Sequence, residues 1–290
     1  MEGVIIKALS GFYYVWDGEK TVACKAKGRF RHDGASPLVG DRIEYALTPE
    51  GTGVVGKILE RKNWFIRPNV ANVDALAFVA CAAKPVTDPY LIDRVSVIAE
   101  HAGCETVVVL NKCDLDPADA LYETYRKSGF PVVRTSAETG EGIAELRELL
   151  RGKITAFTGN SGAGKSSLLN CLSPGLSLET AEISDKLGRG KHTTRHIEIF
   201  ALGGDTFVAD TPGFASFEVD MVSDITAEEL ETRFPDFVPY LGQCRFNDCR
   251  HLSEPDCALR AAVASGAVAE TRHESYARLY DIIRNHKPWD

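Results

Sequence analysis

The sequence has no uninterrupted apolar run of membrane-spanning length. Its first residues, Met1 to Ile6, resemble a strand and lack the basic and apolar regions of a secretory signal peptide. The chain also lacks an excess of positive charge, because its formal net charge is −8 at pH 7. This balance argues against a protein that coats nucleic acid through bulk positive charge. We therefore expect a cytoplasmic protein with no membrane partner.

The charge is unevenly distributed along the chain. Residues 1–66 hold ten basic and eight acidic residues, whereas residues 67–219 and 220–290 each have a balance of −5. With 290 residues, 44% hydrophobic and 26% charged, the chain has room for two or three ordinary globular domains. A nucleic-acid surface, if present, is expected to be local and is first sought in residues 1–66.

Residues 1–66 have the pattern of a small β-domain. Short apolar, β-branched or aromatic runs alternate with turn signals such as Asp17-Gly18 and Glu50-Gly51. Such a series of short strands fits a barrel of the OB type, a fold that commonly binds single-stranded or irregular nucleic acid. The predicted strands are Val4–Ile6, Tyr13–Trp16, Thr21–Ala26, Asp41–Ala46 and Val54–Ile58.

A basic stretch in this domain surrounds one aromatic residue, Phe30. Basic groups around an aromatic ring are the combination that a nucleic-acid groove uses. A solvated loop with one core phenylalanine is the alternative, and the sequence alone favours neither. The basic residues are Lys25, Lys27, Arg29, Arg31 and His32.

A strand, a glycine-rich loop and a helix follow one another in residues 153–172. Ile154–Thr158 predicts a buried strand, and residues 167–172 have helical character. Between them, Gly159-Asn160-Ser161-Gly162-Ala163-Gly164-Lys165-Ser166 fits the pattern G-x-x-x-x-G-K-[ST] of a phosphate-binding loop. An ordinary glycine-rich turn is the alternative, but the flanking strand and helix argue against it. The chain is therefore predicted to bind a nucleoside triphosphate.

The loop has the residue types that phosphate binding needs. Glycines let the backbone curl so that successive N–H groups point at the β-phosphate, and the helix N-terminus adds its positive dipole end. Lys165 is expected to reach the β- and γ-phosphates, and the Ser166 hydroxyl to ligate Mg²⁺. The residues expected to contact the nucleotide here are Gly159, Asn160, Ser161, Gly162, Ala163, Gly164, Lys165, Ser166 and Ser167.

A second motif indicates that the base is guanine. Thr106–Leu110 predicts a strand that ends in Asn111-Lys112-Cys113-Asp114, at the edge where an α/β sheet presents ligand groups. The Asp114 carboxylate can accept from guanine N1–H and the 2-amino group, while Asn111 supports the loop and base and the Lys112 stem stacks on the base. The next strand leads into Ser136-Ala137, where a backbone N–H can meet guanine O6.

The motifs occur in an unusual order. In a Ras-like GTPase the phosphate-binding loop comes first, whereas here the base-recognition motifs precede it. Because domain termini often lie close together, a circular permutation has a low physical cost. We predict an α/β multi-domain chain: an OB-type β-barrel at residues 1–67, a circularly permuted Ras-like P-loop GTPase domain at 68–220, and a helical zinc-binding domain at 221–290.

Two later stretches are expected to respond to the γ-phosphate. Residues 188–195 have the character of a switch loop, in which Thr194, with Thr193 as the alternative, closes on Mg²⁺ and the γ-phosphate. Asp210-Thr211-Pro212-Gly213 then supplies the pattern D-x-x-G, in which Asp210 holds Mg²⁺ and the Gly213 N–H senses the γ-phosphate.

Phe214 stands where Ras carries its water-orienting glutamine. Intrinsic hydrolysis is therefore expected to be slow, and another group must position the attacking water. His192 is the nearest group by sequence, with a merely solvated histidine as the alternative. The predicted catalytic residues are His192, Thr194 and Lys165.

A metal-ligand pattern follows in the C-terminal part. Cys244-x₄-Cys249-x-His251-x₅-Cys257 supplies three thiolates and one imidazole within fourteen residues. These ligands complete a tetrahedral Zn²⁺ site with no open position, so the site is expected to be structural. Clustered cysteines without metal are the alternative, but so small a segment needs a cross-link such as a bound metal to be stable. The other cysteines are expected to be ordinary reduced thiols: Cys24, Cys81, Cys104, Cys113 and Cys171.

In their order, these motifs resemble the ribosome-small-subunit-dependent GTPase A family (RsgA, also called YjeQ or YloQ). The resemblance covers N-K-C-D, S-A, G-N-S-G-A-G-K-S, H-T-T-R, D-T-P-G and the cysteine cluster, and it spans essentially the whole chain. It extends to Arg61-Lys62-Asn63, Arg67-Pro68 and Ala71-Asn72-Val73-Asp74 at the first domain junction. No phosphate, base or zinc position departs from the family pattern.

The resemblance implies a GTPase that acts late in the assembly of the small ribosomal subunit. Such a protein would bind GTP or GDP with Mg²⁺, carry one structural Zn²⁺, act as a monomer, bind the 30S subunit and 16S rRNA, and hydrolyse GTP faster when bound there. Two other interpretations remain open. One is a large-subunit assembly GTPase of the same permuted order, against which the barrel and cysteine cluster argue. The other, suggested by Phe214, is a non-enzymatic GTP-dependent RNA-binding switch.

Overall fold

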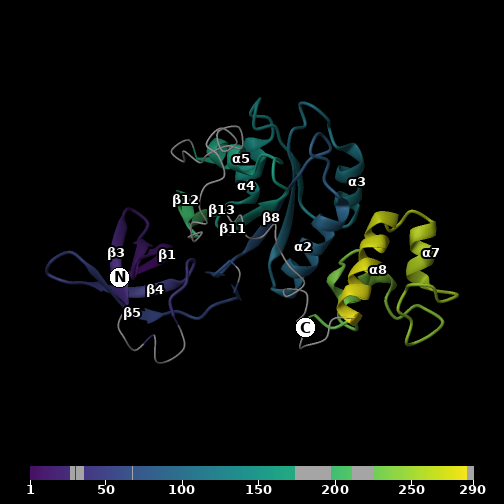
Figure 1. Cartoon of the computed structure of the whole chain (residues 1–290), viewed down its shortest axis with the longest axis horizontal. Coiled ribbons are helices and arrows are strands. Elements are labelled where there is room, and N and C mark those ends of the chain that lie inside the picture. The colour runs from purple at the N-terminus through teal and green to yellow at the C-terminus, as the bar shows by residue number, and fades with distance from the viewer. Residues whose placement is uncertain (27–29, 31–35, 67, 174–196, 211–224, 286–290) are drawn as a thin grey trace. The chain divides into compact units, whose positions relative to one another are not determined.

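The computed structural model describes residues 1–26, 30, 36–66, 68–173, 197–210 and 225–285 (Figure 1). The chain divides into two compact units, and each unit combines segments from different parts of the sequence. The first unit comprises Met1–Ala75, Ile143–Thr158 and Gly164–Phe214. The second unit comprises Leu76–Gly142, Gly159–Ala163 and Ala215–Asp290. This division by packing does not follow the three predicted domain boundaries, which stay predictions.

The N-terminal part of the first unit is a closed five-stranded barrel with the strand order β1-β2-β3-β5-β4. Strands β3 and β5 run parallel, and the other neighbours in the barrel are antiparallel. All five predicted strands are confirmed, with small changes at their ends. The strands are β1 (Glu2–Leu9), β2 (Phe12–Trp16), β3 (Thr21–Ala26), β4 (Arg42–Leu47) and β5 (Gly53–Ile58).

Alternating side chains fill the barrel, as the period of a strand requires. In β4, for example, Ile43 and Tyr45 are buried between exposed neighbours. Cys24 of β3 lies opposite Gly53 of β5, and the two strands approach so closely there that a Cβ on Gly53 would lie 2.2 Å from the Cys24 sulfur. Glycine at position 53 is therefore a packing requirement of the barrel.

Phe30, the aromatic residue of the basic stretch, is only 8% exposed and belongs to the buried core. Its ring is therefore not offered to a base, and the core interpretation of this phenylalanine holds. The Lys25 ammonium lies 4.9 Å from the ring centre of Phe12. The other basic residues of the stretch lie outside the described residues: Lys27, Arg29, Arg31 and His32.

A short hairpin, β6 (Trp64–Phe65) and β7 (Val70–Ala71), follows the barrel. Polar side chains fix the chain on both sides of it. Arg61 binds the fully buried Asp41 through two nitrogens, at 2.7 and 2.8 Å. Asp74 donates its backbone N–H to the Ile154 carbonyl and accepts from the Ile154 N–H, both at 2.9 Å. These contacts join the barrel segment to the strand that begins at Ile154.

Each unit also contains strands outside the barrel. In the second unit the neighbours follow the order β10-β9-β8, and β9 and β10 are parallel. In the first unit the order is β11-β13-β12, with β11 and β13 parallel and β12 antiparallel to β13. The strands are β8 (Ala75–Ala80), β9 (Glu105–Leu110), β10 (Val132–Arg134), β11 (Ile154–Gly159), β12 (Ile199–Gly203) and β13 (Thr206–Asp210).

Helices alternate with the strands from β8 to β11 along the chain. At the start of α2 (Pro89–His101), the Asp88 carboxylate accepts the Tyr90 N–H at 3.0 Å and caps the helix. Helix α3 (Asp119–Lys127) was not anticipated. Helix α4 (Ile143–Leu149) precedes the phosphate-binding strand, and the helix predicted after that strand is confirmed as α5 (Lys165–Leu172).

The C-terminal part of the second unit is helical. Its described elements are the 3₁₀ turns η3 (Leu230–Arg233) and η4 (Val238–Tyr240) and the helices α7 (Ala258–Ala264) and α8 (Glu270–Asn285). Figure 1 shows α8 beside α2, and side chains of both helices share one buried cluster with η3. Among the helices that the structure describes, none has the length and apolar character needed to cross a bilayer.

Candidate nucleotide and metal sites

The glycine loop begins where β11 ends, at Gly159. Its backbone has a φ of +130°, and a Cβ there would lie 2.2 Å from the carbonyl oxygen of Val79. Only glycine fits both the conformation and the space. At the far end of the loop, Gly164 is the N-cap of α5 with a φ of +93°. The strand, loop and helix predicted from the sequence are therefore present in that order.

Asn111 joins the loops that the sequence predicts for the base and the phosphates. Its side-chain amide donates to the carbonyl of Ala163 in the glycine loop at 2.8 Å, and the residue is 2% exposed. Its side-chain oxygen accepts the Ala137 N–H and lies near the Thr135 hydroxyl, both at 3.3 Å. The Asn111 backbone N–H donates to Ala80 at 2.8 Å. Three motifs that are far apart in the sequence thus meet at one buried amide.

The other residues of the base-recognition loops range from exposed to fully buried. Asp114 is exposed, so its carboxylate is accessible from solvent. Lys112 adopts a left-handed backbone (φ +64°), and its ammonium donates to the carbonyl of Lys84 at 2.9 Å. Ser136 is buried, and its hydroxyl accepts the Thr139 N–H at 3.1 Å. The Ala137 N–H, predicted to face guanine O6, donates to Asn111 in this structure.

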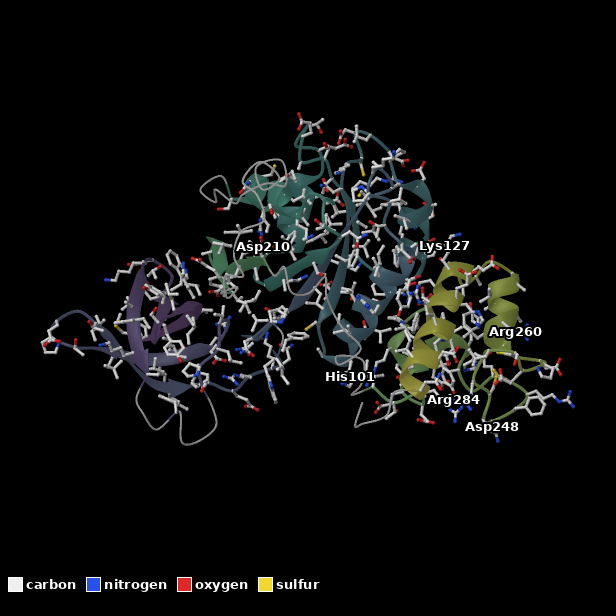
Figure 2. All side chains as sticks on the ribbon, in the orientation of Figure 1. His101, Lys127, Asp210, Asp248, Arg260 and Arg284 are labelled. Atoms are coloured by element: carbon white, nitrogen blue, oxygen red, sulfur yellow. The ribbon has the colours of Figure 1, made fainter. Side chains whose placement is uncertain are left out.

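Lys165 and Asp210 are partly buried and influence each other electrostatically. Burial lowers the pKa of Lys165, and the Asp210 carboxylate opposes this shift. Burial raises the pKa of Asp210, and Lys165 opposes that shift in turn. Asp210 stands at the end of β13 and is labelled in Figure 2. Ser166 follows Lys165 in the first turn of α5. A hydroxyl and a carboxylate are the oxygen ligands that suit Mg²⁺.

Several predicted residues of the switch regions lie outside the described residues. They are His192, Thr193, Thr194, Gly213 and Phe214. Their roles stay predictions.

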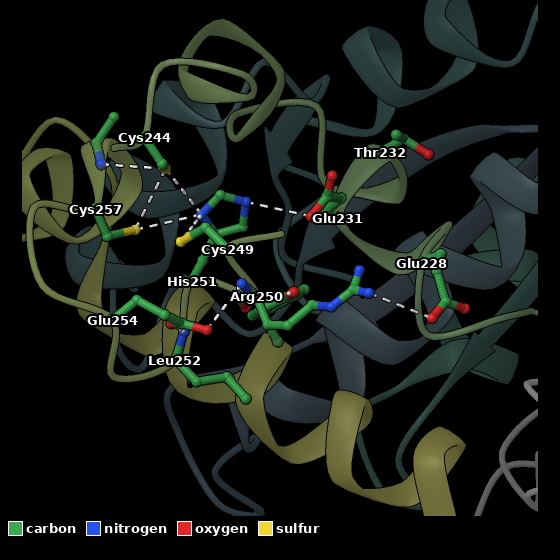
Figure 3. A network of polar contacts seen from close by, with 12 residues as sticks. Glu228, Glu231, Thr232, Cys244, Cys249, Arg250, His251, Leu252, Glu254 and Cys257 are labelled. Atoms are coloured by element: carbon green, nitrogen blue, oxygen red, sulfur yellow. Dashed lines mark hydrogen bonds and ion pairs between the residues drawn. The ribbon is translucent and has the colours of Figure 1, made fainter. Parts of the chain in front are cut away.

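The four predicted metal ligands converge in the second unit. The three sulfur atoms and an imidazole nitrogen of Cys244, Cys249, His251 and Cys257 all lie within 4.8 Å of one another. The Nδ1 atom of His251 is 3.4, 3.5 and 3.3 Å from the sulfurs of Cys244, Cys249 and Cys257 (Figure 3). Three thiols and one imidazole in this arrangement match the tetrahedral ligand set of a structural metal ion. The group can therefore hold a metal.

The pKa values of the ligands shift in different directions, and burial raises the pKa of the Cys249 thiol to about 12. Burial raises the pKa of the Cys257 thiol, but the Arg260 N–H and His251 outweigh this effect and hold it below its usual value. A lower pKa favours the thiolate, which is the form that binds metal. A hydrogen bond to Glu231 raises the pKa of His251 to about 9. Because Glu231 lies far from the ligands in the sequence, the spacing of the motif gave no sign of it.

Base-recognition motifs that precede a phosphate-binding loop place this chain among the circularly permuted P-loop GTP hydrolases. Two family models match it: the RsgA N-terminal domain over residues 2–55 and the RsgA GTPase over residues 58–220. The chain belongs to the RsgA GTPase family. The non-enzymatic interpretation is thereby set aside.

Similar proteins align along the whole chain. A protein of Geobacillus sp. (strain WCH70), named small ribosomal subunit biogenesis GTPase RsgA, is 45% identical over 99% of both chains. A protein of the same name from Thermotoga petrophila is 43% identical over 98% of both. The crystal structure of YjeQ from Thermotoga maritima has a TM-score of 0.82 and 40% identity, and covers 99% of both chains. That of YloQ, described as a circularly permuted GTPase, has a TM-score of 0.81 and 37% identity, and covers 99% of this chain and 96% of its own.

Proposed function

We propose that this chain hydrolyses GTP during biogenesis of the small ribosomal subunit, binds the 30S particle and 16S rRNA, and is stimulated by that binding. One observation supports this most strongly: relatives named for this role align with 99% of the chain at 45% identity. The closed N-terminal barrel is a fold that commonly binds nucleic acid, so it is the proposed RNA-contacting part. The proposed boundaries are 1–67, 68–220 and 221–290, in a monomeric cytoplasmic protein.

The nucleotide would be held by groups that the chain presents from several loops. The backbone N–H groups of residues 159–164 and the Lys165 ammonium would bind the β- and γ-phosphates. The Asp114 carboxylate would accept from the guanine edge, with Asn111 fixing its loop to the glycine loop. Ser166, Thr194 and Asp210 would hold Mg²⁺, which, when bound, neutralises charge on the phosphate oxygens. Gly213 would donate its N–H to the γ-phosphate.

Hydrolysis requires a water molecule aligned with the γ-phosphorus. Phe214 has no polar atom with which to orient that water. We propose that His192 accepts a hydrogen bond from it, and that 30S binding brings this histidine into place. A slow site completed by its partner would explain stimulation by the subunit.

The C-terminal metal site is proposed to hold one Zn²⁺ in a structural role. Residues 211–224 connect Asp210 to the helical part that contains this site. An order–disorder change in the switch residues on loss of the γ-phosphate would therefore act directly on a module that can bind a partner. This coupling is the proposed route by which hydrolysis releases the protein from the subunit.

Nucleotide binding tests the phosphate-loop assignment. Lys165→Ala removes the ammonium proposed for the β- and γ-phosphates, so GTP affinity measured by calorimetry should fall below detection. Lys127→Ala, at an exposed position at the end of α3 (labelled in Figure 2), is the matched control and should bind GTP normally. Undiminished GTP affinity of Lys165→Ala would overturn the assignment.

Base selectivity tests the role of Asp114. Asp114→Asn replaces an acceptor by an amide donor, which suits the 2-oxo group of xanthine better than the 2-amino group of guanine. The variant should lose affinity for GTP and gain affinity for xanthosine triphosphate. Retained selectivity for GTP would refute the base-reading role.

A further inference from the structure

The two ring nitrogens of His251 have different surroundings. The Nδ1 atom faces the three cysteine sulfurs at 3.3 to 3.5 Å. The Nε2 atom points the opposite way and lies 3.2 Å from a carboxylate oxygen of Glu231, as Figure 3 shows. The imidazole is 4% exposed and the Glu231 side chain 24% exposed, so solvent competes little for this contact. The arrangement is that of a metal-facing nitrogen with a carboxylate behind it.

Capping hydrogen bonds and packing hold the 3₁₀ turn that carries Glu231. Thr226 and Glu229 cap each other's backbone N–H groups at 3.2 and 3.3 Å, immediately before the 3₁₀ turn η3 that carries Glu231. The neighbouring Leu230 is fully buried in a cluster that includes Val97 of α2. The carboxylate is therefore held by packing as well as by its hydrogen bond to the histidine.

The peptide that carries His251 is anchored from its other side by α8. The His251 carbonyl lies 2.6 Å from a ring nitrogen of His273, and the Arg250 carbonyl accepts from the Tyr276 hydroxyl at 2.9 Å. His251 itself adopts a left-handed backbone, with a φ of +60°. With the backbone fixed by α8, the direction of the imidazole is set by what its Nε2 atom contacts.

We propose that Glu231 is a positioning residue of the metal site: it fixes the proton of His251 on Nε2, aims Nδ1 at the metal, and links metal binding to the segment 226–233. Carboxylates that accept from the second nitrogen of a metal-bound histidine fix its tautomer and orientation and raise its basicity. Glu231 lies twenty-one residues beyond Asp210 and precedes every proposed ligand in the sequence. Metal binding would thus hold the segment 226–233, which follows the D-T-P-G motif in the sequence. The inference rests on the proposed metal site.

A nearby acidic residue provides the matched control. Glu228 lies three residues before Glu231, and its carboxylate is 3.6 Å from the Arg250 guanidinium. Its side chain is 67% exposed and contacts no proposed ligand directly, so this ion pair contributes little. Removing Glu228 tests the loss of an acidic side chain from the same segment without changing the partner of His251.

The experiment measures metal affinity, with Zn²⁺ and Co²⁺ as the probes. The full-length protein and its variants are titrated against a chromophoric chelator, and the visible absorption of the Co²⁺ form reports the ligand geometry. Glu231→Ala should bind about 10- to 100-fold more weakly. Glu231→Gln should fall between this variant and the unmodified protein, because its amide oxygen still accepts from Nε2. Glu228→Ala should bind as the unmodified protein does.

Two results would overturn the proposal, and they differ. If the unmodified protein binds metal but Glu231→Ala binds it equally tightly, Glu231 has no positioning role while the metal site stands. If the unmodified protein binds neither metal stoichiometrically, the metal site falls and the role of Glu231 falls with it. Amide hydrogen exchange tests whether misfolding causes any loss of metal affinity. If the fold is intact, the amides of α8 should be as well protected in Glu231→Gln as in the unmodified protein.

Discussion

The Arg272 guanidinium of α8 lies 2.8 Å from the carboxylate of Asp93 in α2, and both side chains are fully buried. Asp236 binds the same guanidinium from a second side, and the Tyr125 hydroxyl donates to Asp93 at 2.9 Å. Burial alone would lower the pKa of Arg272, but the two carboxylates outweigh it and raise the pKa above its usual value. The C-terminal helices are thus joined to α2 by charged groups inside a shared core.

Replacing Arg272 by methionine should strongly destabilise the second unit. The change leaves Asp93 and Asp236 buried without their cation, which costs about 3–5 kcal/mol when one partner of a buried pair is removed. Urea unfolding followed by circular dichroism measures the change. Arg284→Met, at an exposed position of the same helix (labelled in Figure 2), should shift stability by less than about 0.5 kcal/mol. Equal effects of the two variants would contradict a structural role for the Arg272 pair.

The barrel offers a test of packing between two strands. Gly53→Ala should destabilise the protein by about 1–3 kcal/mol, because the new methyl group would lie 2.2 Å from the Cys24 sulfur. Adding Cys24→Ala removes that sulfur and should restore part of the loss, giving a favourable coupling in a double-mutant cycle. Gly56→Ala on the same strand is the control, since the nearest atom lies at an ordinary 3.4 Å. Additive effects of Gly53→Ala and Cys24→Ala would show that the two residues do not meet.

Asn111 should matter for both the phosphate loop and the base loop. Asn111→Ala removes the amide that bonds to the buried Ala163 carbonyl and to the Ala137 N–H, and leaving the Ala163 carbonyl unsatisfied costs about 1–3 kcal/mol. GTP and GDP affinities should therefore both fall by at least about tenfold, while preference for guanine over xanthine, assigned to Asp114, persists. Thr135→Val removes one hydroxyl near the amide and should cost less. Calorimetric titration of each nucleotide distinguishes these outcomes.

The requirement for Mg²⁺ should depend on pH in a defined direction. Burial raises the pKa of Asp210, so this carboxyl gains its proton at a higher pH than an exposed aspartate does. A protonated carboxyl does not ligate Mg²⁺, so the Mg²⁺ concentration for half-maximal GTP hydrolysis should rise as the pH falls toward the acidic range. In Asp210→Asn the requirement should be higher at every pH and should lose this dependence. An unchanged pH dependence in the variant would exclude Asp210 as the titrating group.

Local patterns were sufficient to predict most of the fold. The Asp88-Pro89 pair is a local signal for the start of α2, because capping and a proline in the first turn act within a few residues. The cysteine and histidine spacing likewise predicted a cluster that the structure assembles. Helix α3 gave no such signal: its N-cap, Ala118, makes no side-chain hydrogen bond, and Tyr125 is the helix residue that is buried. Packing against the rest of the unit, more than local sequence, stabilises that helix.

Other features depend on contacts between distant residues. Thr226 and Glu229 form a local capping pair, but the segment that follows is one 3₁₀ turn, because Phe234 precedes Pro235 and is extended. The Asn111 amide meets a carbonyl fifty-two residues away, and Arg272 meets a carboxylate one hundred and seventy-nine residues away. A charged residue such as Arg272 is ordinarily expected at the surface of a helix. Neither the contact of Asn111 nor that of Arg272 can be recognised from a pattern in the local sequence.

GTP turnover by the purified protein, alone and with added small or large ribosomal subunits, tests the central proposal most directly. We expect slow turnover of the protein alone, strong stimulation by the small subunit and little by the large one. Lys165→Ala should be inactive under all three conditions, which ties the signal to this site. Equal turnover with and without small subunits, or stimulation by large subunits only, would contradict the proposed partner.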